Sequence, residues 1–135
     1  MSKLLTKLSN EEHGTAIIES AFVLIIMLAM TFAMIDFGRY AYTHNMVQSA
    51  ANEGARAGVS DFSNAEAAAE GKLIALDASK SNVTVAKSTL SNGEIIQVDV
   101  TYQFEFITPI LGAVAGGPIE VAGSASKMTV PDSDE

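Results

Sequence analysis

The sequence places one acidic side chain inside a long apolar run, where a charge needs a physical explanation. Glu19 follows Gly14 by five residues, and no charged residue, proline or glycine occurs from Ser20 to Ile35. A carboxylate within a membrane segment costs roughly 2.5 to 3.5 kcal/mol on insertion scales, so Glu19 is a functional candidate. The alternative is an acid that snorkels to the membrane surface, because Glu19 lies near the end of the run.

The other residues that could do chemistry form no catalytic or metal-binding constellation. His13 precedes the apolar run and His44 follows it, so the two histidines would lie on opposite sides of a membrane and could not share a metal ion. Asp99 and Glu105 fall on the polar face of a predicted strand, which favours a solvated surface. The chain has no cysteine, hence neither a thiolate site nor a disulfide, and its redox compartment stays open. We expect no enzyme activity, no metal and no cofactor.

Length and charge limit the remaining possibilities. At 135 residues the chain allows one small domain beyond the apolar segment, without room for a separate enzyme domain. The formal net charge of −8 argues against nucleic-acid binding, which requires a basic face.

The apolar run is long enough to cross a membrane. From Thr15 to Ile35 it covers roughly 21 residues, about 32 Å as a helix. Lys3 and Lys7 before the run favour a cytoplasmic N-terminus by the positive-inside rule. A secretory signal peptide is the rival interpretation. It ranks lower because the run is too long, contains Glu19 and has no clear small-x-small cleavage site at its end.

After the run the pattern stays helical, and we expect one continuous helix from about Thr15 to Val59, roughly 65 Å long, with its second half outside the membrane. One stripe of this second half holds positions at steps of three and four: Phe37, Tyr40, Ala41, His44, Val47, Ala51, Gly54 and Gly58. Tyr40 and Tyr42 suit an interfacial aromatic belt.

Ala50, Gly54 and Gly58 form a ladder of small residues that permits close helix packing. The partner could be another subunit. We favour the chain's own sheet, because these positions fall beyond the membrane.

The rest of the chain predicts a small α+β domain, in which the second half of the long helix packs on an antiparallel sheet. Ser63 and Glu66 have capping-box spacing before a short helix at Ala65–Ala78. The predicted strands are Asn82–Lys87, Glu94–Phe106 and Ile119–Val130. A turn at Ser91–Gly93 joins the first two strands, and a connection at Thr108–Pro118 leads to the third. Gly123 is a possible bulge within the third strand.

Several of these motifs together resemble the TadE-like pseudopilins of the tight-adherence (Flp) pilus machinery. Gly14 and Glu19 at the head of an apolar helix are similar to the processing site of type IV pilins. The match continues through four further stretches: Ile35–Tyr40, Ser49–Gly58, Thr108–Leu111 and Ile119–Ser126. Two departures are Ser20, where the family often has an aromatic residue, and the absence of a proline from the span.

The resemblance implies a role for each residue at the head of the helix. A prepilin peptidase would cut between Gly14 and Thr15, and Glu19 would pair with the new N-terminal amine of a neighbouring subunit. The expected organisation is a prepilin-type leader (1–14), the transmembrane half of the helix (15–35), an extracytoplasmic α+β domain (36–130) and an acidic tail (131–135).

The sequence therefore predicts a minor pilin or pseudopilin that takes part in Flp (type IVb) pilus assembly. Its expected place is the bacterial inner membrane, single-pass, with the domain in the periplasm. Its expected partners are the prepilin peptidase, other pilin-like subunits and the inner-membrane assembly platform. The alternative is a membrane-anchored periplasmic binding or scaffold module that never enters a filament. Such an anchor would have no need of Gly14 and Glu19 at these positions.

Overall fold

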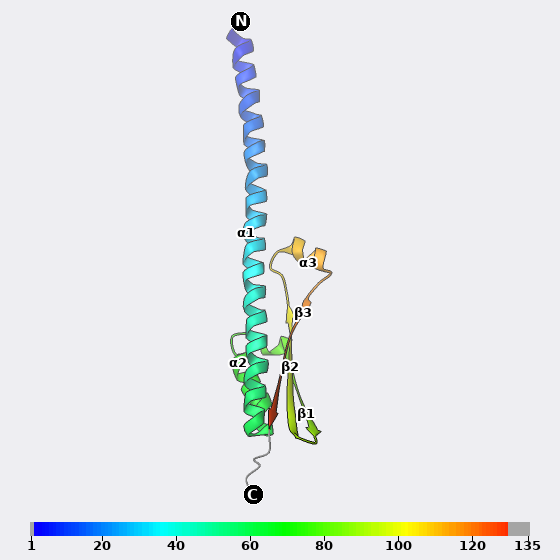
Figure 1. Ribbon diagram of the computed structural model, residues 1–135. Helices are drawn as coiled ribbons and strands as arrows, with labels where there is room; N and C mark the ends of the chain where they lie inside the picture. The colour runs from blue at the N-terminus through cyan, green and yellow to red at the C-terminus, as the bar shows by residue number, and fades with distance from the viewer. Residues whose placement is uncertain (1, 130–135) are drawn as a thin grey trace.

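A single helix runs through almost half of the chain. The computed structural model describes the backbone from Ser2 to Thr129 and the side chains from Gly14 onward, so the expected acidic tail lies outside the described residues. Helix α1 (Ser2–Ser60) is unbroken, which confirms the predicted continuous helix and extends it back through the segment expected to be a leader. Its N-terminal part stands alone, whereas its C-terminal part lies against the rest of the protein (Figure 1).

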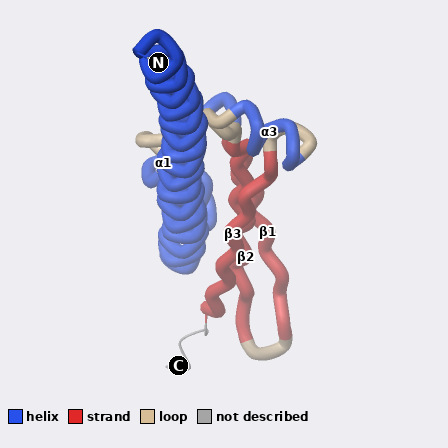
Figure 2. The backbone as a smooth tube through the Cα atoms, turned by 90° about the horizontal axis from the view of Figure 1, so that it is seen from above, coloured by secondary structure: helices blue, strands red, loops and turns tan. Residues whose placement is uncertain are grey.

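The sheet has three antiparallel strands in the order β1-β2-β3. Their bounds are β1 Ser81–Leu90, β2 Gly93–Phe104 and β3 Ile119–Thr129. The central strand pairs Val98 with Val85 on one side and with Ala125 on the other. Figure 2 shows the sheet beside α1, which gives the α+β class that the sequence predicts.

The core lies between the C-terminal half of α1, the short helix α2 (Ala65–Lys72) and one face of the sheet. The alternating apolar residues of β2 point inward as predicted, with Ile96, Val98, Val100 and Phe104 almost fully buried. Small residues on α1, including Ala50, face them. Because these helix side chains are short, the sheet approaches the helix backbone closely.

The ladder of small residues on α1 is covered by the chain itself. A Cβ atom at Gly54 would lie 2.9 Å from the carbonyl oxygen of Ala65 and 3.1 Å from Val98 Cγ1. A Cβ atom at Gly58 would lie 2.7 Å from Ile96 Cγ2. In this structure the ladder therefore packs against α2 and β2.

Gly123 has a different role from the predicted bulge. Strand β3 pairs with β2 in unbroken register, with Gly123 opposite Val100, so the bulge is wrong. A Cβ atom at Gly123 would instead lie 2.9 Å from both Cα and N of Gln48 on α1. The glycine is needed because the helix backbone crosses β3 at this position.

The short helix α2 begins at Ala65 as predicted, but it is shorter and its capping differs. It ends at Lys72, and a second 3-10 turn, η2 (Ala78–Lys80), follows before β1. The predicted capping box of Ser63 and Glu66 is wrong, because the Ser63 hydroxyl donates a hydrogen bond of 2.7 Å to Asp61 Oδ1. Asp61 Oδ1 also accepts a hydrogen bond of 3.0 Å from the backbone amide of Ser63, and this bond caps the 3-10 turn η1 (Phe62–Asn64) that precedes α2.

The connection between β2 and β3 contains a helix that the sequence did not predict. Helix α3 (Pro109–Ala115) begins with a proline and is followed by Gly116 as its C-cap, whose φ of +80° is left-handed. Strand β2 correspondingly ends at Phe104 and not at Phe106. Helix α3 covers the end of the sheet that is nearer to the N-terminal part of α1 (Figures 1 and 2).

Candidate functional site

The N-terminal half of α1 presents apolar side chains to its surroundings on every side. Its large exposed hydrophobic residues are Ile17, Ile18, Phe22, Val23, Leu24, Ile25, Ile26, Met27, Leu28, Met30, Phe32, Met34 and Ile35. Among the described residues α1 is the one helix long and apolar enough to cross a membrane, and its most apolar window is 0% buried. Exposure of a contiguous apolar surface of this extent to water is unfavourable, and the helix is compatible with single-pass membrane anchoring.

The residues singled out by the sequence lie at the start of this exposed half. Gly14, Thr15 and Glu19 are all exposed, and a Cβ atom at Gly14 would meet nothing within 4 Å. The peptide bond between Gly14 and Thr15 belongs to an unbroken helix, so a protease would have to unwind α1 locally to reach it. Thr15 and Glu19 are one turn apart on the same helix face.

Glu19 carries the charge in this apolar surface. It makes no ion pair with any side chain from Gly14 to Thr129. A carboxylate surrounded by exposed apolar residues is suited to a cationic partner on another molecule.

A second group of residues fixes the folded domain to α1 where the apolar run ends. Asp36 is 1% exposed. Its Oδ1 accepts a hydrogen bond of 2.9 Å from the backbone amide of Ile107, and its Oδ2 accepts one of 2.8 Å from the amide of Thr108. These two amides immediately precede α3, so one carboxylate holds the β2–α3 connection against the helix.

Arg39 completes this junction from one turn further along α1. Its Nη1 lies 3.3 Å from Asp36 Oδ1 and 3.3 Å from the carbonyl oxygen of Glu105, and its guanidinium lies over the Phe104 ring at 5.2 Å. Tyr40 packs edge-on against Phe104 with ring centroids 5.7 Å apart. Tyr40 is partly buried and packs against the domain core, while its predicted place in an interfacial belt stays a prediction.

The surroundings of Asp36 favour its ionised form in spite of its burial. Burial raises the pKa of Asp36, but the hydrogen bonds from Ile107, Thr108 and Arg39 outweigh it and lower the pKa below its usual value. The Thr108 hydroxyl is also buried, and it meets no described partner in hydrogen-bond geometry. We therefore assign the stabilisation of the carboxylate to the two backbone amides and the guanidinium.

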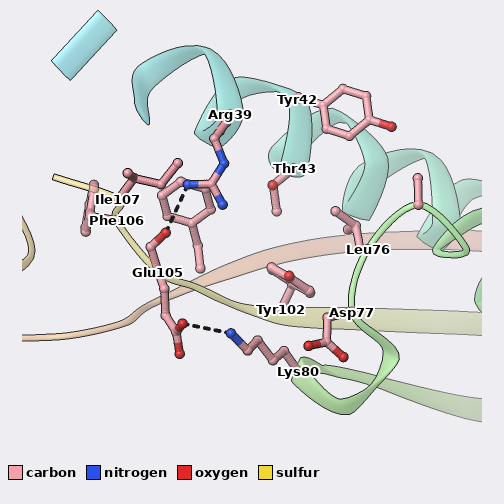
Figure 3. Close-up of a pocket in the computed structure, with 12 residues that line it drawn as sticks. Arg39, Tyr42, Thr43, Leu76, Asp77, Lys80, Tyr102, Glu105, Phe106 and Ile107 are labelled. Carbon is pink, nitrogen blue, oxygen red and sulfur yellow. Dashed lines mark hydrogen bonds and ion pairs between the residues drawn. The ribbon is translucent and has the colours of Figure 1, made fainter. Parts of the chain in front are cut away.

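A shallow cleft of about 360 Å³ opens beside the junction. Figure 3 shows Arg39 on one side and Lys80 on the other, with Glu105 between them. Lys80 Nζ lies 2.8 Å from Glu105 Oε2. Within the described part of the chain, no cluster of three or more histidine, cysteine or acidic side chains could hold a metal ion.

Sequence reasoning missed the junction and misplaced part of the buried stripe. Phe37 and His44, predicted on the stripe, are exposed, whereas Asp36 and Thr43 are buried there. The available signal was that Asp36 is the first charged residue after the apolar run. Its partner Thr108 is 72 residues away, and no local pattern indicates that pairing.

Comparison with known proteins identifies the segment that carries these features. Residues 14–56 match the model of the TadE-like protein family. The match begins at Gly14 and includes Glu19 and Asp36, and it confirms the resemblance over these residues. No curated protein and no solved structure matches the chain significantly.

Proposed function

We propose that this chain, TadE-like over residues 14–56, is a minor pilin or pseudopilin that takes part in assembly of a tight-adherence (Flp, type IVb) pilus. One observation carries the proposal: a fully exposed apolar helix, with Glu19 near its start, continues without a break into the helix that bears a folded domain. Such a subunit can sit in a membrane and exchange lipid for the apolar helices of other subunits without refolding its domain.

The head of α1 supplies the chemistry in this proposal. A prepilin peptidase cuts after Gly14, which has open space around it. The new amine of Thr15 then pairs with Glu19 of a neighbouring pilin-like subunit. In a low dielectric this pairing removes two isolated charges at once, which favours association and fixes the axial register of the helices.

The proposed location is the bacterial inner membrane, with the N-terminus in the cytoplasm and the domain in the periplasm. The lysines before the span, Lys3 and Lys7, support this orientation. A reporter fused after Glu135 is expected to be active only outside the cytoplasm. Cytoplasmic activity would overturn the orientation.

Processing is the test that separates this proposal from a plain membrane anchor. Coexpression with a prepilin peptidase should leave Thr15 as the first residue, as measured by intact mass. Gly14→Trp should block cleavage by filling the small-residue site. Gly38→Trp is the matched control, because Gly38 is also exposed on α1 and a Cβ atom added there would meet nothing within 4 Å, so this variant should be cleaved normally.

The contrary result is equally clear. If the peptidase cleaves its own pilin but leaves this chain intact, the processing proposal is wrong. The alternative of an anchored periplasmic binding or scaffold module, which stays outside any filament, would then explain the exposed helix.

A further inference from the structure

We propose that the domain rests on the membrane surface through an apolar foot, formed by Ile107, Ile110 and Val114, that inserts among the lipid headgroups. This proposal depends on the membrane anchoring proposed above. It adds a second contact with the bilayer, made by the folded domain itself and separate from the spanning helix.

The foot is exposed although its side chains are large and apolar. Ile107 is 56% exposed, Ile110 is 66% exposed and Val114 is 82% exposed. Ile110 and Val114 lie four residues apart in α3, so they share one face of that helix. No residue of the described chain covers this face.

The foot belongs to a stretch without charge in an acidic protein. No charged residue occurs from Phe106 to Ile119, whereas the chain as a whole has a formal net charge of −8. An uncharged apolar stretch can enter the interface of a membrane with anionic lipids, from which the acidic surfaces of the domain are repelled.

The junction places the foot at the height where the spanning helix leaves the bilayer. Asp36 is the first charged residue after the apolar run, and its carboxylate binds the amide of Thr108, the residue directly before α3. In Figures 1 and 2, α3 caps the end of the sheet that faces the N-terminal part of α1. The foot thus lies beside α1 at the height where the apolar run ends, in a region where interfacial helices bury their apolar face.

The opposite end of the sheet has no comparable surface. Leu90 and Met128 are partly exposed there, but the ion pair of Lys87 and Glu94 and the charge of Lys127 surround them. At the α3 end the ion pair of Lys80 and Glu105 lines the cleft beside Ile107, but α3 itself carries no charge, so its exposed apolar face suits contact with lipid.

The test uses the absence of tryptophan from the chain. The full-length protein is reconstituted in lipid vesicles as three single variants: Val114→Trp in the foot, Met27→Trp in the spanning half of α1, and Ser91→Trp in the hairpin turn at the far end of the sheet. Each is measured in vesicles whose lipids carry bromine either near the headgroup or deep in the acyl chains. Bromine quenches a tryptophan only on close approach.

We expect the Val114→Trp fluorescence to be blue-shifted and quenched most by the shallow bromines. Met27→Trp should be quenched most by the deep bromines, and Ser91→Trp by neither. If Met27→Trp is quenched while Val114→Trp emits as in water, the proposed contact of the foot with lipid is wrong, whereas the proposed membrane anchoring by α1 is supported. If Met27→Trp itself escapes quenching, the membrane anchor is wrong and the foot falls with it.

A second copy of the chain is the competing occupant of this face. In that case the Val114→Trp fluorescence would be insensitive to bromine, yet shielded from a soluble quencher to an extent that rises with the ratio of protein to lipid. That result would overturn the proposal in favour of a subunit contact.

Discussion

Asp36 on α1 and Thr108 before α3 are joined by a hydrogen bond of 2.8 Å that connects residues 72 apart in sequence. The donor is a backbone amide, so the contact depends on the path of the β2–α3 connection and not on the type of side chain at Thr108. With the parallel bond from Ile107, it fixes the domain at one height along the helix. A long helix that carries its domain in a defined orientation needs such a contact where its exposed apolar part ends.

The first prediction concerns the stability that this contact provides. Asp36→Asn should lower the free energy of unfolding of the domain by about 1–3 kcal/mol, because an amide replaces one acceptor oxygen with a donor that faces a backbone N–H. The measurement is guanidinium-induced unfolding of the detergent-solubilised full chain, with hydrogen exchange of the β2 amides as the probe of unfolding. The control is Glu120→Gln, which removes the charge of an exposed residue and should change the free energy of unfolding by less than about 0.5 kcal/mol. Equal stability of both variants would contradict the role assigned to Asp36.

The second prediction is the pH dependence of that difference. Since the pKa of Asp36 is lowered in the folded state, the contribution of its carboxylate is complete above the unfolded pKa and disappears as the pH falls through the folded pKa. The stability difference between wild type and Asp36→Asn should be constant from neutral pH down to about pH 5 and shrink below about pH 4. A difference that grows on acidification would mean that the carboxylate is protonated in the folded protein.

The third prediction concerns the crossing of α1 over β3. Gly123→Ala should destabilise the domain by about 1–3 kcal/mol, because the added Cβ would lie 2.9 Å from backbone atoms of Gln48, which cannot move independently of the helix. Gly71→Ala is the control, since Gly71 in α2 has nothing within 4 Å of the new atom and alanine favours a helix. Thermal unfolding should therefore separate the two glycines. A tolerated Gly123→Ala would show that the helix stands further from the sheet.

The features that sequence reasoning predicted correctly are those with a strong local period. The alternation through Ile96, Val98 and Val100 indicated a strand with one buried face, and the apolar and small residues at steps of three and four indicated that α1 continues beyond the apolar run. Each signal repeats many times within a short window, so errors at single positions do not matter.

The features that it missed depend on single long-range contacts. The stripe on α1 was correct at Val47, Ala51, Gly54 and Gly58 but began one residue late, at Phe37. A buried Asp36 looks like a solvated charge until its amide donors from the β2–α3 connection are in place. Gly123 indicated a bulge locally, although its cause is Gln48 on another element. The same limit applies to Glu19, whose proposed partner belongs to another molecule.

The last prediction concerns Glu19. If the amine of Thr15 in one subunit pairs with Glu19 of the next, Glu19→Gln should leave insertion and cleavage intact and reduce association with other pilin-like subunits, because glutamine keeps the shape and removes the charge. Glu19→Asp should be intermediate, since the charge remains but reaches less far. Glu66→Gln, an exposed acid on α2, is the control and should behave as wild type.

Crosslinking measures this association directly. Cysteines at Ala16 and Ser20 flank Glu19, and the two positions share one helix face, since the Ser20 hydroxyl donates a 2.8 Å hydrogen bond to the Ala16 carbonyl. The chain has no cysteine of its own, so in otherwise cysteine-free subunits any disulfide between them reports these positions alone. We expect Glu19→Gln to lose both the crosslink and piliation. Wild-type amounts of both would mean that Glu19 is a snorkelling surface residue, because a carboxylate paired inside the membrane could not be neutralised without leaving the opposing amine unpaired.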